Sequence, residues 1–261
     1  PYWQDVVTAQ PAGYELDTQT NTVKISTPEA LAWWAKTDPD RNVVLTADID
    51  LAGYKWRSTR CKNFNGNGHV ISNGHIIDRG DHIGFISYTE GKIENLGLDN
   101  FYVKVHGNGT GVLCGELMGS MQGCYVMNSV VDGVDYTGGL AGMCNDGTIT
   151  NCFVNVYSSG ARWAGLMVGS THRAVIKNCY AAGRFRQRAY CYNGGIVAYA
   201  DGGTVTNCFS VQMPMGVIGY KGETIINDTA IFVKDAEGFK LLTPVIADEQ
   251  PITDLLEALN T

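Results

Sequence analysis

The chain has 261 residues, of which 44% are hydrophobic and 17% charged, and its formal net charge is −7. An acidic chain without a basic stripe does not fit a nucleic-acid binder, because such binders neutralise phosphates with clustered lysine and arginine. No run approaches the ~18 consecutive apolar residues of a membrane-spanning helix, so we expect no membrane span in this chain.

The first predicted element is a short helix that begins near Thr27. Thr27 suits the N-cap, Pro28 suits the first helical position, and Glu29 complements the positive end of the helix dipole. A stack of β coils must cover its open ends, because uncovered strand edges pair with other chains. We therefore predict that residues 1–41 form an N-terminal extension and capping helix.

From residue 84 onward, two short apolar phrases alternate along the chain. The first is glycine-rich, as in Gly138-Gly139-Leu140-Ala141-Gly142, and the second is typified by Ile149-Thr150-Asn151-Cys152-Phe153. The cysteines of the second phrase lie at positions 124, 152, 179 and 208, so the steps are 28, 27 and 29 residues. Short apolar phrases separated by turn residues at a constant step predict stacked coils with parallel strands.

The predicted fold is therefore all-β: a right-handed parallel β-helix, or β-solenoid, of roughly 27-residue coils. We assign the coils to residues 42–232. We predict a C-terminal cap at residues 233–261, which can lead into a further region. Within this cap, Ile252–Leu259 has the pattern of a short amphipathic helix.

The ladder cysteines occupy one equivalent position in successive coils. Leu96 fills the same position one coil earlier, so the slot is apolar and the thiols are interpreted as small buried hydrophobes. Parallel side-chain vectors suit disulfide geometry poorly, and the chain lacks the CxxC or Cys/His spacing of a metal site. Cys61, Cys144 and Cys191 lie off the ladder, and a disulfide among them is left open.

An asparagine stands one position before the ladder in most coils. These residues are Asn95, Asn151, Asn178 and Asn207, and Gly123 replaces the asparagine in one coil. Stacked asparagines can hydrogen-bond to one another and to corner backbone groups. We interpret the column as a turn ladder rather than a ligand site.

Convergent carboxylates are the signature of a glycosidase on such a scaffold. The candidate pairs are Asp48 with Asp50, Asp78 with Asp81, and Asp132 with Asp135. Strand-end or turn hydrogen bonding accounts for the first pair, and solvation in a loop for the last. The five histidines lack metal-binding spacing. We therefore expect no catalytic residues, metal or cofactor, and keep a polysaccharide-active enzyme, a lyase or glycoside hydrolase, as the alternative function.

The sequence offers one candidate binding surface. Counting two residues back from each glycine phrase gives Tyr136, Arg162 and Tyr192, and equivalent positions stack in a solenoid. Aromatic and arginine side chains on a rigid face suit glycan or acidic-polymer binding, although aromatics can also simply pack between coils. The candidate ligand-binding residues are Tyr136, Arg162, Trp163, Arg184, Arg186, Arg188, Tyr190 and Tyr192.

A recognisable combination of phrases comprises Ile25–Leu31, Leu45–Leu51 followed by Trp56, Phe64–Ile71, and the Gly-Gly-Leu-Ala-Gly and Ile-x-Asn-Cys-Phe/Tyr coils. Together these phrases resemble the GLUG-motif family of bacterial cell-surface proteins. The resemblance covers about residues 23–230, and it departs at Gly123 and at Asp228 in the last cysteine slot. It implies a secreted or surface protein of bacteria such as Bacteroides, with adhesin-like roles and without agreed catalytic residues.

We therefore expect a monomeric, adhesin-like β-solenoid that is extracellular or on the bacterial cell surface. The expected partner is a glycan or an extracellular protein, and the residues favour binding over catalysis.

Overall fold

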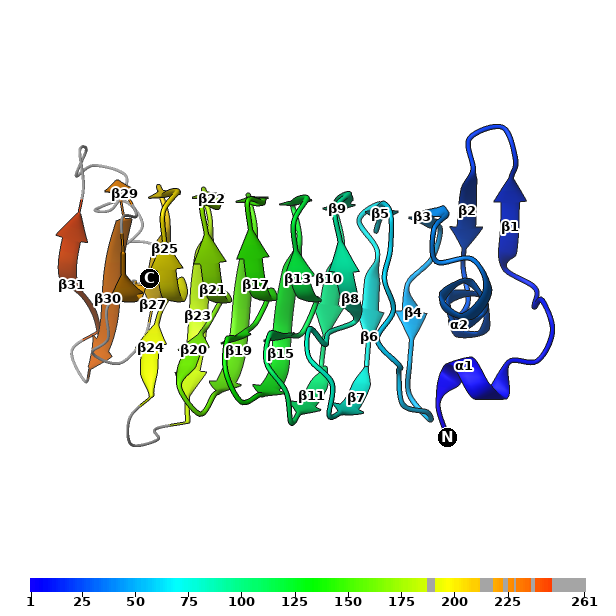
Figure 1. Cartoon of the computed structure of the whole chain (residues 1–261), viewed down its shortest axis with the longest axis horizontal. Helices are drawn as coiled ribbons and strands as arrows, with labels where there is room; N and C mark the ends of the chain where they lie inside the picture. The colour runs from blue at the N-terminus through cyan, green and yellow to red at the C-terminus, as the bar shows by residue number, and fades with distance from the viewer. Residues whose placement is uncertain (187–190, 212–217, 223–224, 228, 236–237, 246–261) are drawn as a thin grey trace.

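The computed structural model describes residues 1–186, 191–211, 218–222, 225–227, 229–235 and 238–245. Figure 1 shows a row of stacked coils along the long axis, with two helices at the N-terminal end. The helices are α1, Trp3–Val6, and α2, Pro28–Thr37. The described strands form four sheets, named I to IV below.

Sheet I contains β1 Tyr14–Asp17, β2 Thr22–Ile25, β3 Asn42–Leu45, β5 Phe64–Asn65, β9 Lys92–Glu94, β14 Ser120–Gln122, β18 Thr148–Thr150, β22 Val175–Lys177, β26 Thr204–Thr206 and β29 Ile225–Asn227. Sheet II contains β4 Ile49–Asp50, β6 Val70–Ser72, β7 His75–Asp78, β10 Gly97–Asp99, β11 Tyr102–Val105, β15 Tyr125–Asp132, β19 Phe153–Ser159, β23 Tyr180–Phe185, β27 Phe209–Val211, β30 Thr229–Asp235 and β31 Gly238–Val245.

Sheet III contains β12 Thr110–Gly111, β16 Thr137–Gly138, β20 Trp163–Gly165 and β24 Tyr192–Gly194. Sheet IV contains β8 Ile86–Thr89, β13 Cys114–Leu117, β17 Ala141–Asn145, β21 Val168–His172, β25 Val197–Asp201 and β28 Ile218–Lys221. Figure 1 shows β24 of sheet III below β25 of sheet IV at the same end of the stack.

Equivalent residues of successive coils pair in parallel, as the repeat predicts. Ile149 in β18 pairs with Met121 in β14 and with Ile176 in β22, and all three side chains are fully buried. Among the described strands, the hairpins β1–β2 and β30–β31 are antiparallel. The predicted parallel β-solenoid of roughly 27-residue coils is confirmed.

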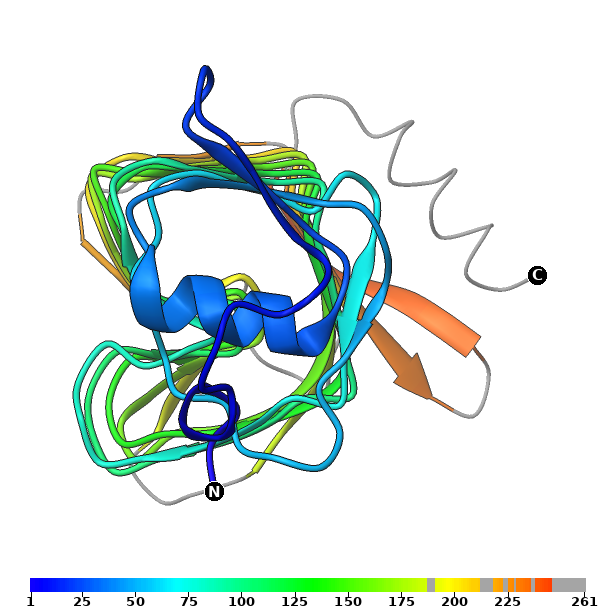
Figure 2. The same ribbon diagram turned by 90° about the vertical axis from the view of Figure 1, so that its right-hand side faces the viewer.

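The predicted N-terminal capping helix is α2. Thr27 is its N-cap, and its hydroxyl accepts a hydrogen bond of 3.2 Å from the Ala30 backbone N–H. Leu31 and Trp34 are fully buried, and Figure 2 shows α2 lying across the open end of the coils. The apolar face of the helix therefore covers the first coil. The predicted C-terminal helix at residues 252–259 lies outside the described residues.

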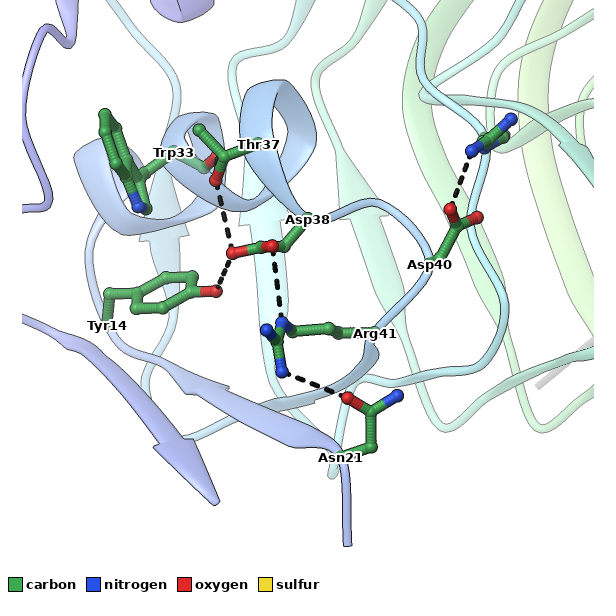
Figure 3. Close-up of polar contacts among 8 residues, drawn as sticks. Tyr14, Asn21, Trp33, Thr37, Asp38, Asp40 and Arg41 are labelled. Carbon is green, nitrogen blue, oxygen red and sulfur yellow. Dashed lines mark hydrogen bonds and ion pairs between the residues drawn. The ribbon is translucent and has the colours of Figure 1, made fainter. Parts of the chain in front are cut away.

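A polar network joins the end of α2 to the β1–β2 hairpin (Figure 3). The Tyr14 hydroxyl donates a 2.6 Å hydrogen bond to Asp38, which follows the helix, and Arg41 Nε lies 3.3 Å from the other oxygen of that carboxylate. The hydrogen bond from Tyr14, with a smaller contribution from the Arg41 guanidinium, lowers the pKa of Asp38. A carboxylate held in this way favours the folded cap when it is ionised.

The asparagine column forms the predicted turn ladder. Its asparagines adopt left-handed backbone conformations, with φ of 53° at Asn151, 55° at Asn178 and 49° at Asn207. The Asn178 amide donates to Asn151 at 3.2 Å, and the Asn207 amide donates to Asn178 at 2.8 Å. Gly123 takes the same position with φ of 61°. Asparagine tolerates this conformation better than most residues, so the turn selects it.

The cysteine column lines the interior. The thiols of Cys152, Cys179 and Cys208 each donate to the carbonyl two residues earlier, at 3.2 Å in every case. Seven cysteines of the chain, including Cys61 and Cys144, are buried free thiols. Burial raises the pKa of Cys61 and of Cys144 to about 12, so these thiols are protonated at neutral pH.

Unequal coil lengths arise from local insertions. The 28-residue step from Cys124 to Cys152 contains a β-bulge, because Met127 pairs with Asn155 while Ser129 pairs with the adjacent Val156. The extra residue, Asn128, has φ of 51°. The bulge absorbs the insertion, so the register of the other sheets is kept.

Glycines form the corner between sheet III and sheet IV. A Cβ atom at Gly138 would lie 2.2 Å from the Ala141 carbonyl oxygen, and one at Gly165 would lie 1.9 Å from the Val168 carbonyl oxygen. Only glycine permits such a close approach of two backbones. The backbones of the two sheets therefore approach closely at this corner, and side chains of both sheets meet there, as Trp163 and Tyr199 do at 5.0 Å.

Candidate ligand-binding surface

Two columns of side chains face each other at this corner, and together we call them the paired columns. The sheet III column is His82, Gly109, Tyr136, Trp163 and Tyr192. Trp163 pairs directly with Tyr192, and the residues that follow the first four members pair with one another from coil to coil. The sheet IV column is Glu116, Met143, Ser170, Tyr199 and Tyr220. Because stacked strands lie ~4.8 Å apart, five positions extend over ~20 Å.

Members of the sheet III column face sheet IV residues from the next coil, as His82, Gly109 and Trp163 show. His82 Nδ1 lies 2.8 Å from Glu116 Oε2 at the N-terminal end. At the other end the Trp163 ring centroid lies 5.0 Å from that of Tyr199. A Cβ atom at Gly169 would lie 2.2 Å from the Tyr136 carbonyl carbon, so the glycine there allows the two sheets to approach.

The C-terminal half of the paired columns is an aromatic cluster, formed by Tyr136, Trp163, Tyr192, Tyr199 and Tyr220. Trp163 stacks on Tyr192 at 4.6 Å with planes 19° apart, and Tyr199 stacks on Tyr220 at 5.1 Å with planes 2° apart. The two stacks meet edge to face, because the Trp163 and Tyr199 planes are 69° apart. Tyr136 lies 6.3 Å from Tyr199. Mutual contacts of this kind fix the orientation of the rings.

The cluster remains open to solvent at its surface. Tyr192 is 51% exposed and Tyr220 is 48% exposed, while the rings of Tyr136, Trp163 and Tyr199 are half-buried. Partial desolvation, with a smaller effect of the Asp201 charge, raises the pKa of Tyr199. The phenol of Tyr199 is therefore a hydrogen-bond donor at neutral pH.

The structure brings together three of the candidate residues. Tyr136, Trp163 and Tyr192 belong to the aromatic cluster, and Trp163 occupies the column position that the residue count assigned to Arg162. Arg162 lies one residue outside the column with Nη1 3.9 Å from Asp135 Oδ2, at the edge of the cluster.

The other candidates lie elsewhere or outside the described residues. Arg184 is exposed on β23 of sheet II, where it pairs with Tyr157. Arg186 follows β23, and its backbone N–H bonds to Ser158 O. Arg188 and Tyr190 lie outside the described residues. Arg184 and Arg186 therefore belong to sheet II and its end rather than to the paired columns, where we expected the arginine-rich run to stand.

Sequence reasoning missed Tyr199 and Tyr220. Tyr199 lies between the fully buried Ala198 and Ala200 on β25, so its side chain faces outward, and Tyr220 pairs with it on β28. Extending the alignment of the glycine phrases by a few residues would have placed both tyrosines in one column. The offset of one coil between the two sheets leaves no signal in the repeat itself, because it depends on how the corner folds.

The first candidate carboxylate pair, Asp48 with Asp50, stabilises turns. Asp48 accepts hydrogen bonds from the Val70 backbone N–H and from His69, and the first of these is the larger cause of its lowered pKa. Asp50 accepts from Asn73 and from the Ala52 backbone N–H, and these bonds lower its pKa as well. These acids are therefore held ionised, which suits a capping role better than proton transfer.

The described residues contain no cluster of three or more histidine, cysteine or acidic side chains able to hold a metal ion. Over the same part of the chain, no helix is both long enough and apolar enough to cross a membrane.

Comparison with known proteins supports the fold. No protein-family model matches the chain, and no curated protein matches it. A crystal structure of a putative immunoglobulin A1 protease from Bacteroides ovatus is similar, with a TM-score of 0.65 and 19% sequence identity over 93% of this chain and 89% of that chain. At this identity the similarity shows a shared β-solenoid architecture and nothing further.

Proposed function

We propose that this β-solenoid is an adhesin-like protein that binds a glycan through its aromatic cluster without catalysis. The observation that carries the proposal is the cluster itself, with two stacked pairs of rings on a rigid scaffold and Tyr192 and Tyr220 about half exposed. Sugar rings present apolar C–H faces between hydroxyl groups, so they can stack on aromatic rings while phenols and amides bind their hydroxyls.

The arrangement suits a linear polymer of sugars. The paired columns repeat along the solenoid axis, so successive units of a polysaccharide can meet equivalent positions and add their binding energies. Among the described residues, charges lie beside the cluster rather than within it: Arg162 faces Asp135, and Asp201, whose charge acts on Tyr199, lies 3.4 Å from His172. A surface of rings and hydroxyls favours a neutral glycan over a charged polymer.

A polysaccharide-active enzyme is supported less well than a binding protein. Asp48 and Asp50, the most closely spaced of the three candidate pairs, bind backbone N–H groups and Asn73 rather than pointing together into a site. The protease name belongs to the Bacteroides ovatus structure, and we do not extend it to this chain.

We further propose that the chain works outside the cell or on the bacterial cell surface. The resemblance of its phrases to GLUG-motif surface proteins supports this location. Protease shaving of intact cells of the source bacterium, followed by detection of the released chain, tests the location.

Glycan binding is tested with a panel of neutral soluble polysaccharides, such as β-glucan, mannan, xylan and galactan, followed by calorimetry with oligosaccharides of the best one. Trp163→Ala removes the central ring, and Tyr157→Ala on sheet II is the matched control, because Tyr157 is a 39% exposed aromatic outside the cluster. Loss of a buried ring contact of ~1.5–3 kcal/mol predicts affinity ~10-fold or more lower for Trp163→Ala. Equal loss in both variants, binding only to a protein partner, or absence of glycan binding would overturn the proposal.

A further inference from the structure

The N-terminal end of the paired columns carries polar groups in place of rings. His82 Nδ1 lies 2.8 Å from Glu116 Oε2, and the Asn145 side-chain amide donates a 2.8 Å hydrogen bond to Glu116 Oε1. The Glu116 side chain is 15% exposed and the His82 side chain is 41% exposed. The carboxylate is thus held from both sides, while the imidazole reaches solvent.

These contacts determine which nitrogen of the neutral His82 ring carries the proton. An ionised carboxylate only accepts hydrogen bonds, so Nδ1 must donate to Glu116. Nε2 then presents a lone pair, and the structure gives it no protein partner among the described residues. A carboxylate that orients a histidine in this way is a common means of setting the tautomer at a functional site.

The ring edge that includes Cδ2 borders the next position of the column, which is Gly109. A Cβ atom at Gly109 would lie 2.8 Å from His82 Cδ2 and 3.3 Å from Met143 Sδ. The position between His82 and Tyr136 therefore contains no side chain of the sheet III column, and Met143 lies opposite. Nε2 is bonded to Cδ2, so the acceptor lies on the side of the ring that borders this position.

The backbone holds the histidine in a conformation that costs free energy. His82 has φ of 55°, which costs a residue other than glycine ~1–2 kcal/mol. Its N–H donates 2.7 Å to Asn108 O, and Gly115 lets the neighbouring strand approach, because a Cβ there would lie 2.1 Å from the His82 carbonyl carbon. Gly109 and Tyr136, at the same position of the next two coils, have φ of 70° and 57°, so the left-handed turn belongs to the corner and fixes the direction of the imidazole.

We propose that His82, positioned by Glu116 and Asn145, is a hydroxyl-binding subsite for the same glycan that the aromatic cluster binds. The inference rests on the proposed function. Nε2 accepts a hydrogen bond from a sugar hydroxyl two coils, or ~10 Å, from Tyr136. The ligand class is a neutral oligosaccharide long enough to reach both ends. A sugar carboxylate is disfavoured, because it would face the Nε2 lone pair and the Glu116 charge.

Glu116→Gln is the most informative variant, because it preserves shape and reverses one hydrogen bond. The new Gln Oε1 accepts from Asn145, so its amide faces His82 Nδ1 and donates to it. The proton then moves to Nε2, which becomes a donor and can no longer accept from the hydroxyl. His82→Asn is the second variant, because asparagine tolerates the left-handed backbone and lacks the imidazole. His172→Asn is the matched control, since His172 pairs with Asp201 at 3.4 Å outside the paired columns.

The experiment is calorimetry of the wild type and the three variants with neutral oligosaccharides of two to about six units, taken from the polysaccharide that binds best, and with oligogalacturonate as the acidic probe. Nitrogen NMR of the His82 ring reports the tautomer independently of folding. Loss of one hydrogen bond of ~0.5–1.5 kcal/mol predicts affinity ~2–10-fold lower for Glu116→Gln and His82→Asn with the long oligosaccharides. All variants should bind the shortest oligosaccharides with the affinity of the wild type. His172→Asn should keep the wild-type affinity for the long oligosaccharides as well.

The outcomes separate the two proposals. If Trp163→Ala weakens binding while Glu116→Gln switches the tautomer and leaves every affinity unchanged, the aromatic site stands and the subsite is refuted. A preference for oligogalacturonate over the neutral chains would also refute the subsite. If the wild type binds none of the glycans, the proposed function fails and the subsite fails with it.

Discussion

Replacement of Asn178 separates the two physical contributions of the turn ladder. Asn178 has φ of 55° and hydrogen-bonds to both Asn151 and Asn207. Asn178→Ala loses both bonds and places an alanine in the left-handed region, whereas Asn178→Gly loses the bonds without the strain. Gly123 shows that glycine fits this turn, with φ of 61°.

The expected magnitudes follow from these two terms. Two exposed side-chain hydrogen bonds contribute ~1 kcal/mol together, at the lower end of the usual range. The left-handed conformation adds ~1–2 kcal/mol for alanine. We therefore expect Asn178→Gly to lower the free energy of unfolding by ~1 kcal/mol and Asn178→Ala to lower it by ~2–3 kcal/mol.

Urea unfolding followed by circular dichroism measures both variants against the wild type, with an unchanged m-value as the check that the same transition is observed. An alanine variant that is as stable as the glycine variant would refute the reasoning, because the backbone conformation would then carry no cost. An unchanged stability of both variants would show that the ladder bonds contribute nothing.

Three further predictions concern the corner, the cap and the thiols. Gly165→Ala should lower the free energy of unfolding by ~3 kcal/mol or more in urea, because its Cβ would lie 1.9 Å from a backbone oxygen, whereas Gly80→Ala, with 3.4 Å to the nearest atom, should change it by less than ~0.5 kcal/mol. Asp38 has a lowered pKa, so its stabilisation is present above the unfolded pKa of ~3.9 and is lost as pH falls below that value. The stability difference between the wild type and Asp38→Asn should accordingly narrow below pH ~4 in acid titrations of the thermal midpoint, and a difference that does not vary with pH would contradict this. Thiol titration with a chromogenic disulfide should modify Cys191 faster than the buried thiols, and rapid modification of Cys61 or Cys144 before unfolding would contradict their burial and their pKa of about 12.

The architecture was predictable because one physical signal repeats in every coil. Ile149 and Cys152 recur at nearly constant spacing, and equivalent residues of a solenoid must stack, so sheet I and the interior ladder follow directly. The helix cap was predictable for a local reason, since Thr27 and Pro28 form a start signal. The division of each coil into four sheets was not predicted, because the corner angles depend on backbone contacts at glycines such as Gly138.

The candidate surface was predictable only in part. Tyr136, Trp163 and Tyr192 stand at equivalent positions of one phrase, so counting residues found them within one position. The contact of His82 with Glu116 joins two phrases through a one-coil offset, which is a property of the folded corner. No spacing rule in a single sequence encodes such an offset, because both phrases repeat with the same period.

The most direct test of glycan binding at the aromatic cluster is to follow the indole N–H signals of the tryptophans by two-dimensional NMR during titration with a neutral oligosaccharide. Trp163 is at the centre of the cluster, whereas Trp34 and Trp56 are fully buried elsewhere and serve as internal references. The account predicts a saturable shift of the Trp163 signal with the reference signals unmoved. Saturable binding that leaves Trp163 unmoved would contradict it.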